Sequence, residues 1–253
     1  MLSSLAVFSQ LKEINSFGTA DTVVFASVDR PGELYVVLKN NDVQKFDIDG
    51  TLLHTVNFGF TPAILEPRDG SRIFISFREN NSFHFLPPSL QPRLEPQYVD
   101  SAFAITPFLV CPAGDYNLVV LDSADWSLKK ISLKKNELLS ETVLQDTVYR
   151  YANFTYMREY QNLLFLLDKN HGIRMYSTLG KYLKSIPIKD LSWFNFIGED
   201  LYYIREDKLH FINLFTLETR VMQLPFAAHF AILTDERLFL ADHKTIRILT
   251  LKP

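Results

Sequence analysis

One segment type recurs six times along this chain: a short β-rich run, a polar turn, a second β-rich run, and often a third. The spacings between successive copies are 39, 45, 46, 37 and 37 residues, with copies beginning at Leu34, Ile73, Leu118, Leu164, Leu201 and Leu238. A period near 40 residues with about four strands per unit is typical of β-propeller blades. The repeat therefore predicts an all-β fold with six blades.

Each copy is preceded by another short β-rich run, so a full unit has an inner strand, two middle strands and an outer strand. These inner strands are expected to begin at Val23, Ala63, Ala104, Ala152, Trp193 and Ala228. The second strand of each unit is nearly continuous in apolar residues, as in VVL, FLL and YYI. That pattern is typical of a strand buried on both faces, here between neighbouring blades.

The sixth unit stops one strand short, because the chain ends at Pro253. Residues 10–17, QLKEINSF, have a strand-like pattern and precede the first inner strand. If this segment supplies the missing outer strand, it closes the ring, whereas an open ring would leave two sheet edges unpaired. We therefore expect residues 11–253 to form a single six-bladed β-propeller domain whose N-terminal strand completes the last blade.

Two units carry an apolar strand that ends in a turn resembling D-x-x-G: KFDIDGTLLHTV at residues 45–56 and MYSTLGKYLKSI at residues 175–186. This element resembles that of NHL-like six-bladed propellers, including many from Bacteroidota envelopes. The likeness covers most of the chain in architecture and two blades in motif. It implies a non-catalytic periplasmic propeller that binds a protein partner. Among such partners is a large outer-membrane β-barrel, the type IX secretion translocon, whose periplasmic mouth a propeller seals.

The first ten residues, MLSSLAVFSQ, are either the tail of a signal peptide or an ordinary first strand. Four Asp-(Ser/Thr)-aliphatic tripeptides favour the periplasm, because Bacteroidota O-glycosylate such sites there; they begin at Asp21, Asp100, Asp122 and Asp146. A cytoplasmic location remains the alternative, since a single cysteine, Cys111, excludes only an intrachain disulfide. No apolar run approaches the ~20 residues of a spanning helix, so direct membrane insertion is not expected.

The net charge of −3 and pI near 6.1 give no reason to expect a nucleic-acid partner. The densest basic stretch is interpreted as the solvated face of a strand pair; it comprises Lys129, Lys130, Lys134 and Lys135.

No catalytic motif stands out: a Gly-rich phosphate loop and a GxSxG elbow are both missing from the sequence. Adjacent carboxylates fall in predicted turns, where Asp favours local hydrogen bonds, and none of the six histidines lies at a ligand spacing from another. We therefore expect no enzyme activity, no cofactor and no metal. The alternative is a lactonase-like enzyme or a sugar-binding protein with a site at the central channel. Its channel-lining residues would be Asn153, Asn195 and His229, near the starts of inner strands.

Aromatic residues are abundant, with 21 Phe and 11 Tyr. Several fall in predicted loops between the outer strand of one blade and the inner strand of the next. They either fill gaps between blades or form a docking face, since loops on a rigid scaffold often carry binding residues. The predicted partner-binding residues are Phe58, Phe60, Tyr149, Tyr151, Trp193, Phe194 and Phe226.

Overall fold

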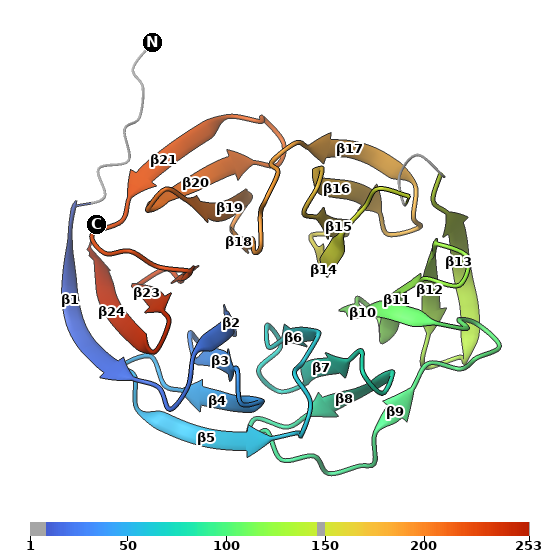
Figure 1. Ribbon diagram of the computed structural model, residues 1–253, viewed down its shortest axis with the longest axis horizontal. Helices are drawn as coiled ribbons and strands as arrows, with labels where there is room; N and C mark the ends of the chain where they lie inside the picture. Colours follow the sequence, from blue (N-terminus) through green and yellow to red (C-terminus); the bar gives the residue numbers. More distant parts are fainter. Residues whose placement is uncertain (1–8, 146–149, 253) are drawn as a thin grey trace. The chain divides into compact units, whose positions relative to one another are not determined.

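The computed structural model describes residues 9–145 and 150–252. All regular structure in these residues is β, arranged as six four-stranded antiparallel sheets, and these are the blades of a six-bladed β-propeller (Figure 1). Within the described ranges, no helix is long and apolar enough to cross a membrane. The chain divides into two compact units: Met1–Gly59 with Phe194–Pro253, called unit 1, and Phe60–Trp193, called unit 2.

Unit 1 contains three blades. The first runs β2-β3-β4-β5: β2 (Val23–Val28), β3 (Leu34–Leu38), β4 (Asp42–Phe46) and β5 (Leu52–Asn57). The second runs β18-β19-β20-β21: β18 (Asn195–Ile197), β19 (Asp200–Arg205), β20 (Lys208–Asn213) and β21 (Thr219–Gln223). The third runs β22-β23-β24-β1: β22 (Phe230–Leu233), β23 (Arg237–Asp242), β24 (Thr245–Lys252) and β1 (Ser9–Gly18).

Unit 2 contains the other three blades. The first has β6 (Ile64–Glu66), β7 (Ile73–Phe77), β8 (Ser82–Leu86) and β9 (Gln97–Tyr98). The second has β10 (Pro107–Ala113), β11 (Asn117–Asp122), β12 (Ser127–Ser132) and β13 (Glu137–Val143). The third has β14 (Phe154–Tyr160), β15 (Leu163–Asp168), β16 (Gly172–Ser177) and β17 (Tyr182–Ile186).

The closing strand predicted from residues 10–17 is confirmed. β1 pairs antiparallel with β24, from Ser9 opposite Lys252 to Gly18 opposite Thr245. It also contacts the first blade of unit 1: the Phe17 and Phe46 rings lie 4.8 Å apart, and Asn15 Nδ2 donates to the Asp49 carbonyl at 2.7 Å. The last blade is thus completed by the opposite end of the chain, as closure requires. Residues 1–8, which include most of the suggested signal-peptide tail, lie outside the described residues.

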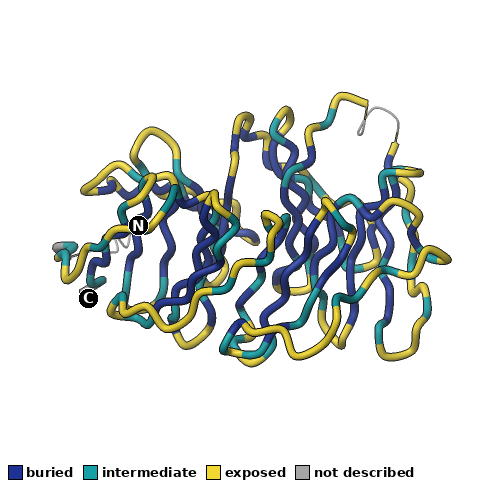
Figure 2. The backbone as a smooth tube through the Cα atoms, turned by 60° about the horizontal axis from the view of Figure 1, so that its bottom comes forward, coloured by how far each residue is buried: buried dark blue, intermediate teal, exposed yellow. Residues whose placement is uncertain are grey.

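The predicted burial of the second strands is also confirmed. Every residue of β3, β7 and β11 is buried, and the centres of β15, β19 and β23 are buried as well. Burial is concentrated on the inner and middle strands, whereas the turns and the outer strands β5, β13 and β21 are mostly exposed (Figure 2). Cys111, on the inner strand β10, is also buried, and burial raises the pKa of its thiol, as expected for a packing residue.

Five of the six inner strands begin one to three residues later than predicted, at Ile64, Pro107, Phe154, Asn195 and Phe230. The inner strand expected from Ala104 begins at Pro107, because the amides of Ile105 and Thr106 donate to the Asp122 carboxylate at 2.9 Å each instead of to a ladder. β9 is only two residues long, since the prolines of LPPSLQPRLEP precede it and cannot donate to a neighbouring strand.

The interpretation of the basic stretch is wrong at Lys129. Its side chain is buried, and its Nζ lies 2.8 Å from Asp122 and 2.8 Å from Asp125. Lys134 and Lys135 are exposed as expected. The difference arises because Lys129 points toward the buried Asp122 at the end of the preceding strand, whereas the other two lie in the following turn.

Candidate functional site

In two blades of unit 2, an aspartate at the end of the second strand holds the start of the inner strand. Asp122 accepts the amides of Ile105 and Thr106, and Asp168 accepts the amide of Asn153 at 3.0 Å. Both carboxylates are 0% exposed. The buried charge is stabilised by these backbone donors and by nearby cations, so these two aspartates are structural clamps.

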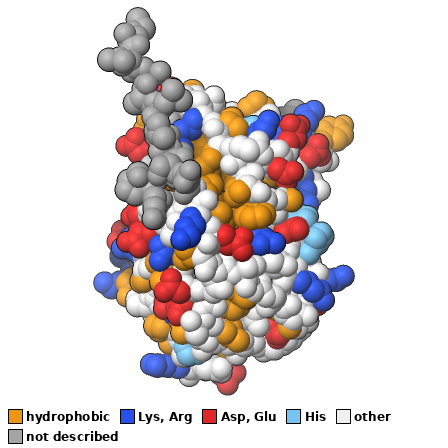
Figure 3. Space-filling model, turned by 90° about the vertical axis from the view of Figure 1, so that its left-hand side faces the viewer, with side chains coloured by type: hydrophobic (Ala, Val, Ile, Leu, Met, Phe, Trp, Pro, Cys, Tyr) orange, Lys and Arg blue, Asp and Glu red, His pale blue; other side chains and the backbone are white. Residues whose placement is uncertain are grey.

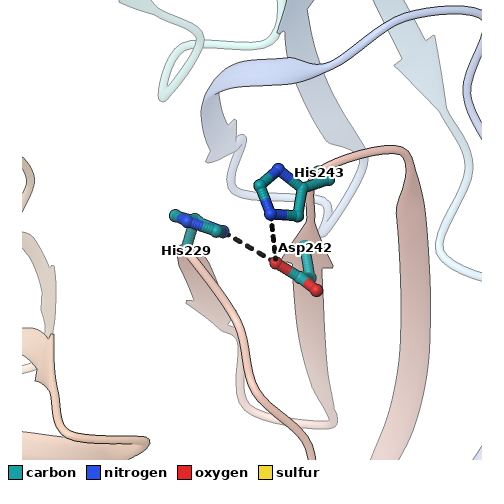
Figure 4. A group of neighbouring side chains, drawn as sticks. All are labelled: His229, Asp242 and His243. Carbon is teal, nitrogen blue, oxygen red and sulfur yellow. Dashed lines mark hydrogen bonds and ion pairs between the residues drawn. The ribbon is translucent and has the colours of Figure 1, made fainter.

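The last blade of unit 1 has an aspartate at the same place but in a different setting. Asp242 ends β23, and its side chain is 42% exposed. Its Oδ1 lies 2.7 Å from His229 Nδ1 and 3.9 Å from His243 Nε2 (Figure 4). The two imidazole rings lie 4.6 Å apart between centroids. Both rings therefore converge on one carboxylate oxygen at the surface.

The local backbone positions these three side chains. His229 immediately precedes β22, and its amide donates to the Ala241 carbonyl at 2.9 Å, which places it across from Asp242. His243 lies in the two-residue turn between β23 and β24, with a φ of 46°. Its carbonyl accepts the Val23 amide at 2.7 Å. The site is thus built on strand ends and a tight turn whose backbone hydrogen bonds are satisfied.

Asp242 also lines a pocket of about 220 Å³ together with Phe226, Ala227, Leu240, Thr245 and Arg247. The Arg247 guanidinium stacks 4.4 Å from the Phe226 ring centroid and pairs with Glu13 at 3.1 Å. The other nearby cation, Lys244, lies 3.5 Å from Asp21. Arg247 and Lys244 thus each form an ion pair with a carboxylate other than that of Asp242.

Of the three residues predicted to line a channel site, His229 belongs to this group. Asn153 and Asn195 are not arranged as ligands. Asn195 is buried at the start of β18, with its Oδ1 accepting the Phe196 amide at 2.8 Å. Asn153 is exposed just before β14. Sequence reasoning missed Asp242 and His243, although an Asp-His pair at a turn opposite His229 was a usable signal.

The structure exposes some of the aromatic residues predicted to bind a partner and buries others. Phe60, Tyr151 and Phe226 are exposed, and Phe58 is half-buried. Trp193 and Phe194 are buried, which corrects their assignment as docking residues: they fill the interior, where large aromatic area is used for packing. Tyr149 lies outside the described residues.

A groove of about 350 Å³ lies at the outer strands of unit 2. It is lined by Thr142, Val143, Leu144, Gln145, Arg174, Tyr176, Gly180 and Tyr182. Gly180, with a φ of +82°, allows the β16–β17 turn to approach β13, because a Cβ there would lie 2.7 Å from Thr142 Oγ1. Val143 and Tyr182 are 62% and 52% exposed. This rim groove is therefore apolar and open to solvent.

Unit 1 carries exposed apolar side chains on its outer hairpin as well. Phe215 and Leu217 lie in the β20–β21 turn, and Val221 lies on β21; all three are exposed. The side of unit 1 that faces the viewer in Figure 3 shows hydrophobic side chains gathered in a patch and bordered by acidic and basic ones. Contiguous apolar surface of this kind is typical of interaction sites.

No protein-family model matches the chain, and no curated protein matches it in sequence. Solved structures match it in fold. BBS1N, solved in complex with ARL6DN, has a TM-score of 0.59 at 12% identity and covers 96% of this chain and 97% of its own. BamB from Moraxella catarrhalis has a TM-score of 0.50 at 8% identity, covering 96% and 98%.

The extracellular domain of a proposed one-component system from B. thetaiotaomicron is also similar, with a TM-score of 0.56 at 12% identity over 89% of this chain. The chain spans about a third of that domain, with 32% of it covered. At these identities the likenesses establish the propeller fold.

Proposed function

We propose that this chain is a non-catalytic propeller that binds a partner protein through the rim groove of unit 2. The observation that carries the proposal is the open apolar lining at the outer strands, with Val143 and Tyr182 largely exposed. Full burial of an exposed aliphatic side chain is favourable by about 1.5–3 kcal/mol, and a partner that covers the partly exposed Val143 gains a share of this.

The proposed occupant is an extended segment of the partner that presents an apolar side chain. β13 and β17, which border the groove, are outer strands; among the residues that the structure describes, they pair with β12 and β16 alone. An extended segment can add to such an edge through main-chain hydrogen bonds while one side chain enters the groove. The complex of BBS1N with ARL6DN supports a protein-binding role, since it shows a similar fold engaged by a protein.

The more specific form of the proposal places the chain in the periplasm, on an outer-membrane β-barrel such as the type IX secretion translocon. Two observations support it: the motif resemblance to envelope propellers and the extracellular origin of one similar structure. The propeller would act sterically there, by blocking the periplasmic mouth. Deleting the gene in its host should then increase entry of a large antibiotic, and unchanged permeability would count against this form while leaving the rim-groove proposal standing.

The rim groove is tested by photo-crosslinking in the native host. A benzoylphenylalanine probe at Val143 or Leu179, next to the groove, should crosslink to one protein, whereas the same probe at Leu94, which is 74% exposed and outside the groove lining, should not. With the purified partner, Val143→Glu should weaken binding about 10- to 100-fold, from the loss of one apolar contact. Equal crosslinking at all three positions would refute the assignment, and Leu94→Glu is the matched binding control.

A second candidate function is binding or turnover of a small ligand at His229, favoured by the pocket beside Asp242. It predicts saturable binding of a lactone or sugar that His229→Ala abolishes and Val143→Glu leaves unchanged. Calorimetry against such ligands with both variants separates the two functions.

A further inference from the structure

We infer that His229, Asp242 and His243 form a three-ligand site for a divalent transition metal, with Zn²⁺ as its ion. These side chains offer two imidazole nitrogens and one carboxylate oxygen, all within 4.8 Å of one another, and no other group of three such residues occurs in the described parts of the chain. Imidazole and carboxylate donors are the common protein ligands of Zn²⁺. The inference is independent of the rim groove, which lies in unit 2.

The distances fit an ion placed between the donors. Zn²⁺ lies ~2.0–2.2 Å from N and O ligands, so tetrahedral coordination separates two donors by about 3.4 Å. Asp242 Oδ1 lies 2.7 Å from His229 Nδ1 and 3.9 Å from His243 Nε2, on either side of that value. Small side-chain rotations therefore bring all three donors to bonding distance, and the ion would replace the proton shared by Nδ1 and Oδ1.

The surroundings of Asp242 differ from those of the buried structural aspartates Asp122 and Asp168. Asp168 also has a histidine partner, with His171 Nδ1 2.7 Å away, but that carboxylate is buried and accepts backbone amides and lies 3.4 Å from Arg174. Asp242 instead faces two imidazoles, and the side chains of His229 and His243 are 59% and 70% exposed. An ion can reach Asp242 from solvent, whereas Asp168 is already neutralised by a cation.

The site leaves room for a fourth ligand. Three protein ligands leave one tetrahedral position open, as in catalytic and ligand-exchanging zinc sites. The side chains of His229 and His243 are 59% and 70% exposed, so a water molecule or a small oxygen donor can occupy the open position from solvent; of the three ligands, Asp242 alone also borders the pocket of about 220 Å³. Lys244 and Arg247 are paired with Asp21 and Glu13, which lowers their repulsion of the ion.

The test uses the full chain without a histidine tag, stripped with chelator and titrated with ZnCl₂ by calorimetry. We expect one saturable Zn²⁺ per chain, and Co²⁺ in its place should give the intense visible bands of four-coordinate cobalt. His229→Ala and His243→Ala should each weaken binding at least 10-fold. His171→Ala is the matched control, because it removes a surface histidine that is also 2.7 Å from an aspartate.

Circular dichroism melts of the metal-free variants establish that each is folded before titration. Absence of saturable binding to the wild-type chain would overturn the inference. So would binding that persists in the folded His229→Ala and His243→Ala variants, or that falls equally in His171→Ala. Partner crosslinking through Val143 should be unaffected by these substitutions, so the zinc site and the rim groove can fail separately.

Discussion

Replacing Lys129 with methionine tests the buried ion pair of unit 2. The Lys129 Nζ is held 2.8 Å from both Asp122 and Asp125, and its side chain is only 6% exposed. Methionine keeps most of the aliphatic stem but removes the charge. The Asp122 carboxylate then stays buried with its backbone donors, the amides of Ile105, Thr106 and Ala124, but without its cation.

The expected cost is about 2–4 kcal/mol in the free energy of unfolding. Removing one partner of a buried ion pair typically costs about 3–5 kcal/mol. The amides that still solvate Asp122 lower this figure, and the exposed Asp125 can be hydrated once the amine is gone. Lys135→Met is the control: its pair with Glu137 is exposed and spans 3.2 Å, so the change should stay within about 0.5 kcal/mol.

Urea denaturation of both variants and the wild-type chain at pH 7 measures the difference. Burial by itself raises the pKa of Asp122, but hydrogen bonds from Lys129 and the backbone outweigh it, and the pKa lies below its ordinary value. A lowered folded-state pKa gives stability that is present above about pH 4 and lost on acidification below it. The difference in free energy of unfolding between the wild-type chain and Lys129→Met should therefore become smaller below pH 4. Equal effects of the two substitutions at pH 7 would refute the buried pair.

Two further predictions concern the backbone of the blades. Deleting residues 11–17 should strip β1 from β24, expose the edge of the last blade and lower the melting temperature markedly; an unchanged melt would contradict closure by this strand. Gly172→Ala should lower the free energy of unfolding by more than about 2 kcal/mol, because φ is +104° and a Cβ would overlap the Ile186 carbonyl. Gly114→Ala is the control, because Gly114 has open space around it, and it should leave the free energy of unfolding nearly unchanged. Urea denaturation measures both.

Predictions from the sequence succeeded where a feature depends on residues that are near one another along the chain. A run such as LYVVL at β3 is apolar at every position, so its burial between blades follows from its composition alone. The missing strand of the last blade could be inferred because an open sheet edge is unfavourable and residues 10–17 were the remaining strand-like segment. The start of β10 could not be placed, because the carboxylate that holds the preceding amides of Ile105 and Thr106 belongs to Asp122, on another strand.

Strand content, blade number and the closing strand were thus determined by the order of residues along the chain, because alternation, apolar runs and turns act over a few neighbours. Tertiary structure alone decided which charged and aromatic side chains are buried, as with Lys129 and Trp193. It also decided that His229 meets Asp242 and His243. These outcomes depend on which strands become neighbours and on the hydrogen-bond donors available there. Neither can be predicted from the residue pattern of a single strand.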